Sequence, residues 1–194
     1  DEVEASRLAL EGGCRWIQLR MKDASHDEIV AAARKIMPLC REYEAVFLID
    51  DHVDICAEVG ADGVHLGKND MDPAEARAIL GNKAIIGGTC NTFADIQNIH
   101  DKVDYIGLGP FRFTTTKKKL SPVLGLDGYR NIVWQCRERG INTPIVAIGG
   151  ITEADILDIM NSGPNGIALS GTIMNADKPV ETTERLVKTL RYRI

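Results

Sequence analysis

The segment between Gly107 and Gly125 combines the residue types that proteins use to bind phosphate. It reads GLGPFRFTTTKKKLSPVLG and joins a Gly-Pro turn to a run of hydroxyls and a run of cations. The residues of these two runs are Thr114, Thr115, Thr116, Lys117, Lys118 and Lys119. A loop of this length is uncommon in a compact domain unless it is functional or disordered, so we predict an anion-binding loop. The alternative is a solvated loop whose lysines only keep the protein in solution, because short basic runs are common.

A second group of cations lies at the end of the apolar run at residues 14–20. Gln18, Arg20 and Lys22 alternate onto one face of an extended segment. Two cations and an amide that face inward would cost free energy without an anionic partner. The spacing therefore predicts a second anion-binding segment. The alternative is that Lys22 and Asp23 are ordinary loop charges.

Carboxylates follow two further apolar runs. Asp50 and Asp51 close the run at 45–50, and Asp70 follows the run at 63–66. Carboxylates beside phosphate-binding cations are typical of Mg²⁺ that is held by one or two side chains and by substrate oxygens. We therefore predict Mg²⁺ as a cofactor. The alternative for Asp51 is the N-cap of the helix that follows it.

The two histidines near these carboxylates do not predict a zinc site. His52 and His65 lack a third nitrogen or sulfur ligand at a zinc spacing. His65 lies within the apolar sequence GVHLG, so we interpret it as a packed strand residue.

Small polar residues and glycines follow three more apolar runs, at 84–88, 143–149 and 165–170. They are Thr89, Cys90 and Asn91, then Gly149 and Gly150, then Ser170, Gly171 and Thr172. Glycine loops in the last two strand–helix units of a barrel are where many barrels bind a phosphate through backbone N–H groups. The sequence therefore predicts two anion subsites, a cationic one that suits a diphosphate with Mg²⁺ and a neutral one that suits a monophosphate. No serine or cysteine is paired with a histidine base, which favours displacement of diphosphate by a second, phosphorylated substrate.

Length and composition narrow the class of protein. The 194 residues carry a net charge of −5 and are 44% hydrophobic, which predicts one domain over 1–194 and gives no reason to expect a nucleic-acid partner. No apolar stretch approaches the length of a membrane span, and we interpret the opening residues DEVEASRLALEGG as a charged helix and not as a signal peptide. The five scattered cysteines favour reduced thiols and a cytoplasmic location. A homo-oligomer is left open.

The elements that must position these residues alternate along the chain. Helical patterns separate the apolar runs, and the run at 103–108 completes a set of seven strands. We expect helices at 25–42, 52–60, 73–80, 92–100, 126–139, 152–162 and 179–191. This order predicts an α/β fold, a (β/α)8 TIM barrel whose first strand would precede Asp1. The alternative is an open doubly wound sheet, which we disfavour because no GxGxxG follows the first strand.

These motifs resemble those of the thiamine phosphate synthase (thiamine-phosphate pyrophosphorylase) family, whose members are (β/α)8 barrels. The resemblance covers essentially the whole chain, in order and in spacing. The matching segments are QLRMK at 18–22, DD at 50–51, HLGKNDM at 65–71, GGT at 87–89, GPFRFTTTK at 109–117, AIGGI at 147–151 and ALSGT at 168–172. The chain departs from the family in three places: Asp50 stands for Asn, Thr89 for Ser and Gly171 for Ser.

The resemblance implies a Mg²⁺-dependent transferase that joins hydroxymethylpyrimidine diphosphate to a carboxythiazole or hydroxyethylthiazole phosphate. Pyrophosphate would leave first, and the thiazole nitrogen would trap the carbocation. The implied residues for the pyrimidine diphosphate are Gln18, Leu19, Arg20, Met21, Lys22, Asp50, Thr89 and Lys117, of which Arg20, Thr89 and Lys117 are catalytic. The implied residues for the thiazole phosphate are Thr114, Thr115, Thr116, Gly150, Ser170 and Gly171. Asp51 and Asp70 would hold Mg²⁺.

Three rival functions remain at this point. A thiazole tautomerase shares the barrel and the thiazole phosphate subsite, but it would not need Arg20, Lys22, Asp51, Asp70 and Lys117 together. A catalytically inactive relative could bind thiazole phosphate or thiamine phosphate. A phosphosugar isomerase of the same fold would need a pair of basic carboxylates or a Cys/His dyad, and neither is evident.

Overall fold

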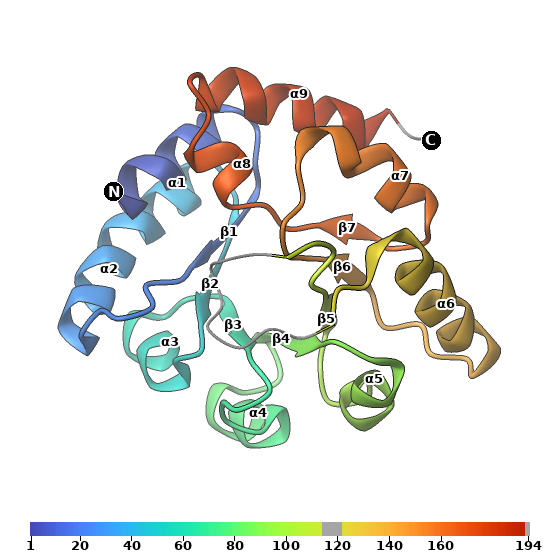
Figure 1. Ribbon diagram of the computed structural model, residues 1–194. Coiled ribbons are helices and arrows are strands. Elements are labelled where there is room, and N and C mark those ends of the chain that lie inside the picture. Colours follow the sequence, from blue (N-terminus) through green and yellow to red (C-terminus); the bar gives the residue numbers. More distant parts are fainter. Residues whose placement is uncertain (114–121, 193–194) are drawn as a thin grey trace. The chain divides into compact units, whose positions relative to one another are not determined.

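The computed structural model describes residues 1–113 and 122–192. These residues form two compact units, one made of Asp1–Ile86 with Ile173–Ile194 and the other made of Gly87–Thr172. Each unit alternates strands with helices (Figure 1). The predicted Thr114, Thr115, Thr116 and Lys117 lie outside the described residues.

The first unit contains the opening strands of the sheet and the helices that follow them. Its elements are α1 (Glu2–Glu11), β1 (Trp16–Leu19), α2 (His26–Glu42), β2 (Val46–Asp50), α3 (Val53–Val59), β3 (Gly63–Leu66), α4 (Pro73–Leu80), the start of β4 (Ile85–Cys90) and α9 (Pro179–Arg191). Helices α1 to α4 are neighbours in chain order, and α9 packs on α1.

The second unit continues the same alternation. Its elements are the remainder of β4, α5 (Phe93–Ile99), β5 (Tyr105–Leu108), α6 (Gly125–Glu138), β6 (Ile145–Ala147), the 3-10 turn η1 (Glu153–Asp155), α7 (Ile156–Asn161), β7 (Gly166–Ile167) and the start of α8 (Gly171–Met174). In Figure 1, helices α5, α6 and α7 lie along one side of β4, β5 and β6.

The strands are hydrogen-bonded neighbours in their sequence order, β1 to β7. The pairs β1–β2, β2–β3, β4–β5, β5–β6 and β6–β7 are parallel. A doubly wound sheet reverses its strand order at a switch point and carries helices on both faces. The sequential order therefore makes that alternative wrong. The closed barrel, with an eighth strand before Asp1, stays a prediction.

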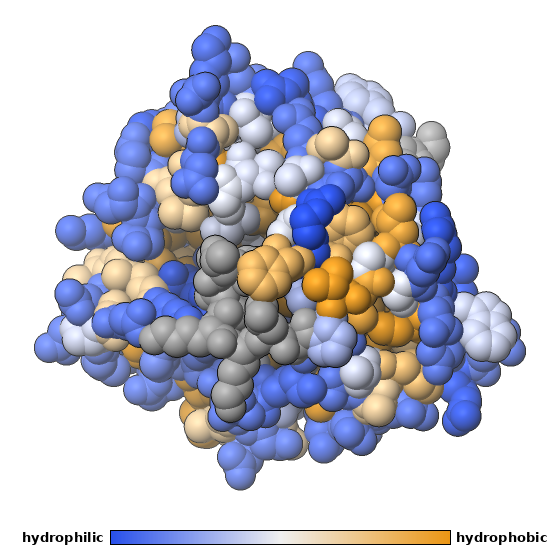
Figure 2. Space-filling model, in the orientation of Figure 1, coloured by the Kyte–Doolittle hydropathy of each residue, from blue (hydrophilic) through white to orange (hydrophobic). Residues whose placement is uncertain are grey.

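Local sequence explains where the helices begin and which faces they bury. Ser25 and Glu28 form a capping box at the start of α2, and Asp72 caps α4 ahead of Pro73. Helix α2 then buries one stripe at helical spacing. The buried residues of α2 are Ile29, Val30, Ala33, Ile36 and Cys40. These stripes leave the polar faces of the helices outward, and blue polar side chains predominate over the helices in Figure 2.

Some predicted boundaries are wrong. Strand β7 holds only Gly166–Ile167 where we expected 165–170, and the expected helix at 152–162 is divided into η1 and α7. The short helix α8 had no sequence signal that we recognised. The five cysteines are free thiols, and four of them are buried. Within residues 1–113 and 122–192, none of the helices has the length and apolar character needed to cross a bilayer.

Candidate functional site

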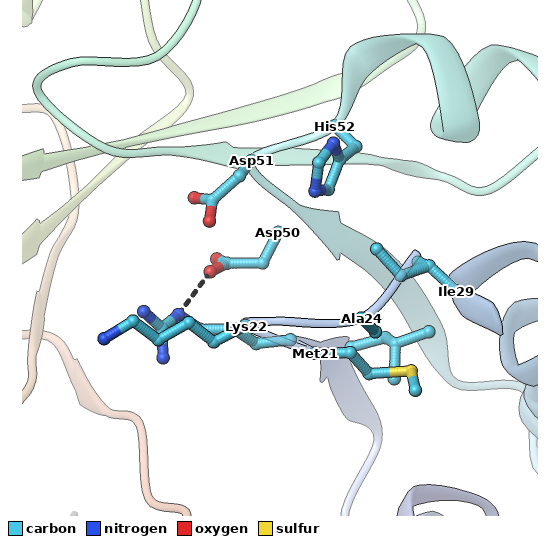
Figure 3. A pocket seen from close by; sticks show the side chains of 9 residues that line it. Met21, Lys22, Ala24, Ile29, Asp50, Asp51 and His52 are labelled. Atoms are coloured by element: carbon cyan, nitrogen blue, oxygen red, sulfur yellow. Dashed lines mark ion pairs between the residues drawn. The ribbon is translucent and has the colours of Figure 1, made fainter. Parts of the chain in front are cut away.

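A polar cavity opens where β1 and β2 end in the first unit. It has a volume of about 210 Å³. Its lining residues are Leu19, Arg20, Met21, Lys22, Ala24, Ile29, Asp50, Asp51 and His52. Because β1 and β2 are parallel and Leu19 pairs with Ile49, the residues that follow each strand meet at the same edge. Figure 3 shows Lys22 and Met21 extending in opposite directions, and Lys22 stands in the turn that follows β1 rather than in the extended segment that we predicted.

Asp50 organises the cationic side of this cavity. Its carboxylate is only 6% exposed, accepts a hydrogen bond from Gln18 Nε2, and pairs with Arg20 Nε at 2.9 Å (Figure 3). The two terminal nitrogens of Arg20 make no hydrogen bond within the part of the chain that the structure describes. The guanidinium is thus oriented by a buried partner while its outer edge stays available to an anion.

Asp51 and Asp70 add a pair of carboxylates beside that of Asp50. The Asp70 Oδ2 atom accepts the Gly67 N–H at 2.6 Å, and a Cβ added to Gly67 would lie 2.7 Å from Asp70 Oδ2 and 4.0 Å from Asp51 Oδ1. Burial raises the pKa of Asp51, and the adjacent Asp70 carboxyl raises it further. Two carboxyl groups that disfavour each other's charge are suited to share a cation.

This pair fits Mg²⁺ better than a metal that needs an all-protein cage. Among the described residues, no group of three or more His, Cys, Asp or Glu side chains gathers at one point. Mg²⁺ commonly binds through one or two carboxylates and completes its shell with water and substrate phosphates. The donor set of Asp51 and Asp70 therefore suits a metal that arrives with a diphosphate.

Two alternatives from the sequence can now be judged. Asp51 does not cap α3, because the N-cap position is His52 and no side chain caps that helix. Asp51 instead adopts a left-handed backbone, with φ 66°, and its N–H donates to the carbonyl of His65 at 2.9 Å. His65 is buried within β3, as we predicted.

In the second unit, three consecutive carbonyl groups after β6 are bound by one short segment of chain. Ile148 O accepts from Phe111 N–H at 2.9 Å, and Gly149 O accepts from Arg112 N–H at 3.1 Å. Gly150 O accepts from Arg112 Nη1 at 2.7 Å. In a trans peptide the N–H points away from the C=O, so the next three N–H groups face away from residues 111–112.

Those three N–H groups belong to Gly149, Gly150 and Ile151, and they donate to no residue in 1–113 or 122–192. Gly149 and Gly150 have φ values of 90° and 69°. A Cβ on Gly149 would lie 2.8 Å from the Cα of Pro110, and one on Gly150 would lie 2.9 Å from the carbonyl of Arg112. Both positions therefore require glycine, and successive free N–H groups in such a turn form an anion-binding nest.

Neighbouring side chains hold the strand ends around this nest. Thr172 Oγ1 donates to Ile151 O at 2.6 Å, which joins the nest to the segment that contains Ser170 and Gly171. Both of these residues are exposed. Asn91 Nδ2 donates to Gly109 O at 2.7 Å, while Thr89 is buried in β4. The segment that contains Ser170 and Gly171 is thus tied to the Gly149–Ile151 turn through Thr172, to which we had assigned no role.

Sequence reasoning missed the side chains that support this turn from behind. Arg112 forms a two-bond ion pair with Asp155 across 43 positions of sequence. Tyr129 on α6 donates to Leu108 O at 2.8 Å and is fully buried. The spacing of Thr152 and Asp155 does indicate a capping box, but nothing in the sequence joins either residue to Arg112.

Comparison with known proteins gives a match over nearly the whole chain. The family model described as thiamine monophosphate synthase matches residues 1–173. A thiamine-phosphate synthase of Phocaeicola vulgatus is 60% identical over 186 residues, which cover 95% of this chain and 89% of the relative. A second thiamine-phosphate synthase, from Bacteroides thetaiotaomicron, is 54% identical over 189 residues. The aligned residues make up 97% of this chain and 90% of that relative.

Solved structures agree with the family match. A thiamine phosphate pyrophosphorylase from Pyrococcus furiosus superposes with a TM-score of 0.87 at 36% identity, covering 98% of this chain and 89% of that chain. An orotidine 5'-phosphate decarboxylase from Pyrococcus horikoshii has a TM-score of 0.69 at 14% identity, covering 97% of this chain and 92% of that chain, and shares the fold alone. This chain therefore belongs to the thiamine monophosphate synthase family.

Proposed function

We propose that this protein joins hydroxymethylpyrimidine diphosphate to a thiazole phosphate and releases pyrophosphate, giving thiamine phosphate. One observation supports the proposal: two groups of residues suit anions of different kinds. The cavity at Arg20 and Lys22 is cationic and adjoins paired carboxylates, which suits a diphosphate with its metal. The nest at Gly149–Ile151 offers neutral N–H groups, which suits a monophosphate.

On the pyrimidine side, the outer edge of Arg20 and the ammonium of Lys22 bind the diphosphate. Asp51 and Asp70 would hold Mg²⁺, which when bound neutralises charge on the diphosphate oxygens. Thr89 hydrogen-bonds the pyrimidine. The other proposed contacts on this side are Gln18, Leu19, Met21, Asp50 and Lys117.

On the thiazole side, the N–H groups around Gly150 bind the phosphate, together with those at Ser170 and Gly171. The sequence resemblance adds Thr114, Thr115 and Thr116 to this side. The nest is supported from behind by carbonyl hydrogen bonds, so it needs little rearrangement when the anion arrives.

The proposed reaction needs no general base. The bond between the pyrimidine methylene carbon and the diphosphate oxygen breaks, and its electron pair leaves with pyrophosphate. The thiazole nitrogen then donates its lone pair to the resulting cation. Arg20 and Lys22 stabilise the charge that grows on the leaving group, which explains why the site is rich in cations. The same cations favour a transferase over a thiazole tautomerase, which handles no diphosphate.

Pyrophosphate release by the purified protein tests the proposal. We expect release only when the pyrimidine diphosphate, the thiazole phosphate and Mg²⁺ are all present. Asp51→Asn and Asp70→Asn should each lower kcat/KM by about a hundredfold, on the order of 2.7 kcal/mol. Asparagine tolerates the left-handed backbone at residue 51, so folding should be kept.

Asp23→Asn is the matched control, because Asp23 is an exposed carboxylate next to Lys22 in sequence. It should leave kcat/KM unchanged. Full activity of the wild-type protein in excess chelator would exclude the metal, and release from the pyrimidine diphosphate alone would indicate a hydrolase instead.

A further inference from the structure

We propose that Arg112 and Asp155 form a positioning pair that holds the Gly149–Ile151 nest in its anion-binding geometry and so sets the affinity for the thiazole phosphate. The inference rests on the proposed function only for the identity of the anion. The pair itself lies within the second unit, and each of its contacts is defined by the structure.

The pair binds the nest within the turn and just after it, because Arg112 contacts Gly150 and Asp155 contacts Thr152. Arg112 Nη1 and Nη2 donate to the two oxygens of Asp155 at 2.8 Å each, and Nη1 also donates to Gly150 O at 2.7 Å. Asp155 Oδ2 in turn accepts from Thr152 N–H and Thr152 Oγ1, both at 2.8 Å. One carboxylate thus links the segment after β5 to the residue that follows the nest.

The nest needs such a restraint because its backbone is intrinsically free. Gly149 and Gly150 have the widest conformational range of any residue type, and fixing both costs entropy. If the Gly150 carbonyl were released, its peptide group could rotate and turn the Ile151 N–H away from the anion. The bond from Arg112 to Gly150 O opposes that rotation directly.

Arg112 itself stands on a rigid base. Its guanidinium carbon lies 5.0 Å from the centre of the Phe111 ring, and Phe111 stacks on Tyr129 with ring centres 6.0 Å apart. Phe111 and Tyr129 are both buried. Through Phe111 and Tyr129, Arg112 therefore fixes the nest relative to α6 and the end of β5.

If the pair served only to stabilise the fold, its loss would lower the free energy of unfolding and leave phosphate affinity unchanged. The Arg112 side chain is 48% exposed and that of Asp155 is 15% exposed, and an ion pair whose cation is half-solvated contributes modestly to global stability. The Arg112 guanidinium lowers the pKa of Asp155 to about 2, so the pair stays charged throughout any practical assay. We therefore expect the loss of this pair to appear in phosphate affinity and not mainly in the stability of the fold.

The experiment compares Arg112→Gln, Arg112→Lys and Asp155→Asn with Arg130→Gln. Arg130 pairs with Asp127 on α6 at 2.9 Å, so it is an arginine–aspartate pair of the same unit with no contact to the nest. The measurements are KM for each substrate and the affinity for inorganic phosphate by calorimetry.

We expect Arg112→Gln and Asp155→Asn to raise KM for the thiazole phosphate by about tenfold, and to weaken phosphate binding in parallel. KM for the pyrimidine diphosphate should change by less than about twofold, because the cations Arg20 and Lys22 that are proposed to bind it lie in the first unit. Arg112→Lys should restore little, because lysine cannot donate to Asp155 and Gly150 from one planar fork. The Arg112→Gln/Asp155→Asn double variant should be no worse than either single one.

Two outcomes would overturn the inference. One is unchanged phosphate affinity in both variants while the wild-type protein binds phosphate. The other is an equal effect from Arg130→Gln. If the wild-type protein binds phosphate but catalyses no transfer, the proposed function fails while the calorimetric arm still decides the role of the pair.

Discussion

Asp50 is the residue at which the sequence resemblance implies a departure from the family pattern that bears on the charge of the site. Its carboxylate is buried between Gln18 and Arg20, which it orients. Asp50→Asn would keep an oxygen that accepts from Arg20 Nε but would remove one negative charge beside the diphosphate. We therefore expect KM for the pyrimidine diphosphate to fall by about threefold to tenfold, on the order of 0.7–1.4 kcal/mol.

Steady-state kinetics at fixed, saturating thiazole phosphate measures this change. Asp50→Ala provides the contrast, because it removes both the charge and the acceptor for Arg20, and it should raise KM instead. Equal KM values in the wild-type and Asp50→Asn proteins would show that the charge of Asp50 does not reach the diphosphate.

In the first unit, residue types and spacing pointed to side chains that the structure brings together, because these residues follow strands that are neighbours in sequence. Alternation placed Gln18 and Arg20 on one face, and both contact Asp50. The role of Arg112 could not be predicted, since its partner Asp155 lies 43 positions away and the contact exists only after β5 and β6 have paired.

At the scale of elements, α6 fixes the strand ends that carry the nest. Tyr129 is fully buried, and its hydroxyl donates to Leu108 O at 2.8 Å, at the end of β5. Tyr129→Phe should lower the free energy of unfolding by about 1 kcal/mol, the net value of one hydrogen bond. Tyr129→Ala should cost about 3–5 kcal/mol, because it also leaves a cavity.

Urea denaturation measures both changes, with an unchanged m-value as the sign that the denatured state is the same. Tyr192→Phe is the control, because the Tyr192 side chain at the end of α9 is 82% exposed and should give no measurable change. A Tyr129→Phe protein as stable as the wild type would mean that water satisfies the Leu108 carbonyl equally well.

The sequence located the elements better than their ends. Periodicity identified seven strands because each is a short aliphatic run between helical patterns. The predicted strand at β7 was longer than the observed one, because Ala168 and Leu169 continue the apolar pattern. The observed strand ends at Ile167. In the part of the chain that the structure describes, β7 has a neighbour on one side alone, so less pairing defines its end.

At the scale of the whole molecule, net charge is a poor guide to the ligands. The chain carries −5, yet both of its proposed anion sites are built from local features, one from cations and one from backbone N–H groups. Composition could exclude classes of partner, but only the order of motifs along the chain predicted two distinct phosphate sites. The cavity at Arg20 and Lys22 lies in the first compact unit, and the Gly149–Ile151 nest lies in the second.

This separation predicts how ligands stabilise the protein. A ligand that binds only the native state raises the free energy of unfolding by about 2.7 kcal/mol at a hundred times its Kd. Mg²⁺-pyrophosphate and thiazole phosphate should each raise Tm. Lys22→Gln should remove the shift caused by pyrophosphate and keep that caused by thiazole phosphate. Gly150→Ala should do the reverse, and its own Tm should be lower, because its Cβ would lie 2.9 Å from Arg112 O at a φ of 69°.

Thermal scans of the three proteins with each ligand measure these shifts, and circular dichroism confirms that each variant is folded. A folded variant that loses both shifts would contradict two separate sites, because it would show that one group of residues binds both anions.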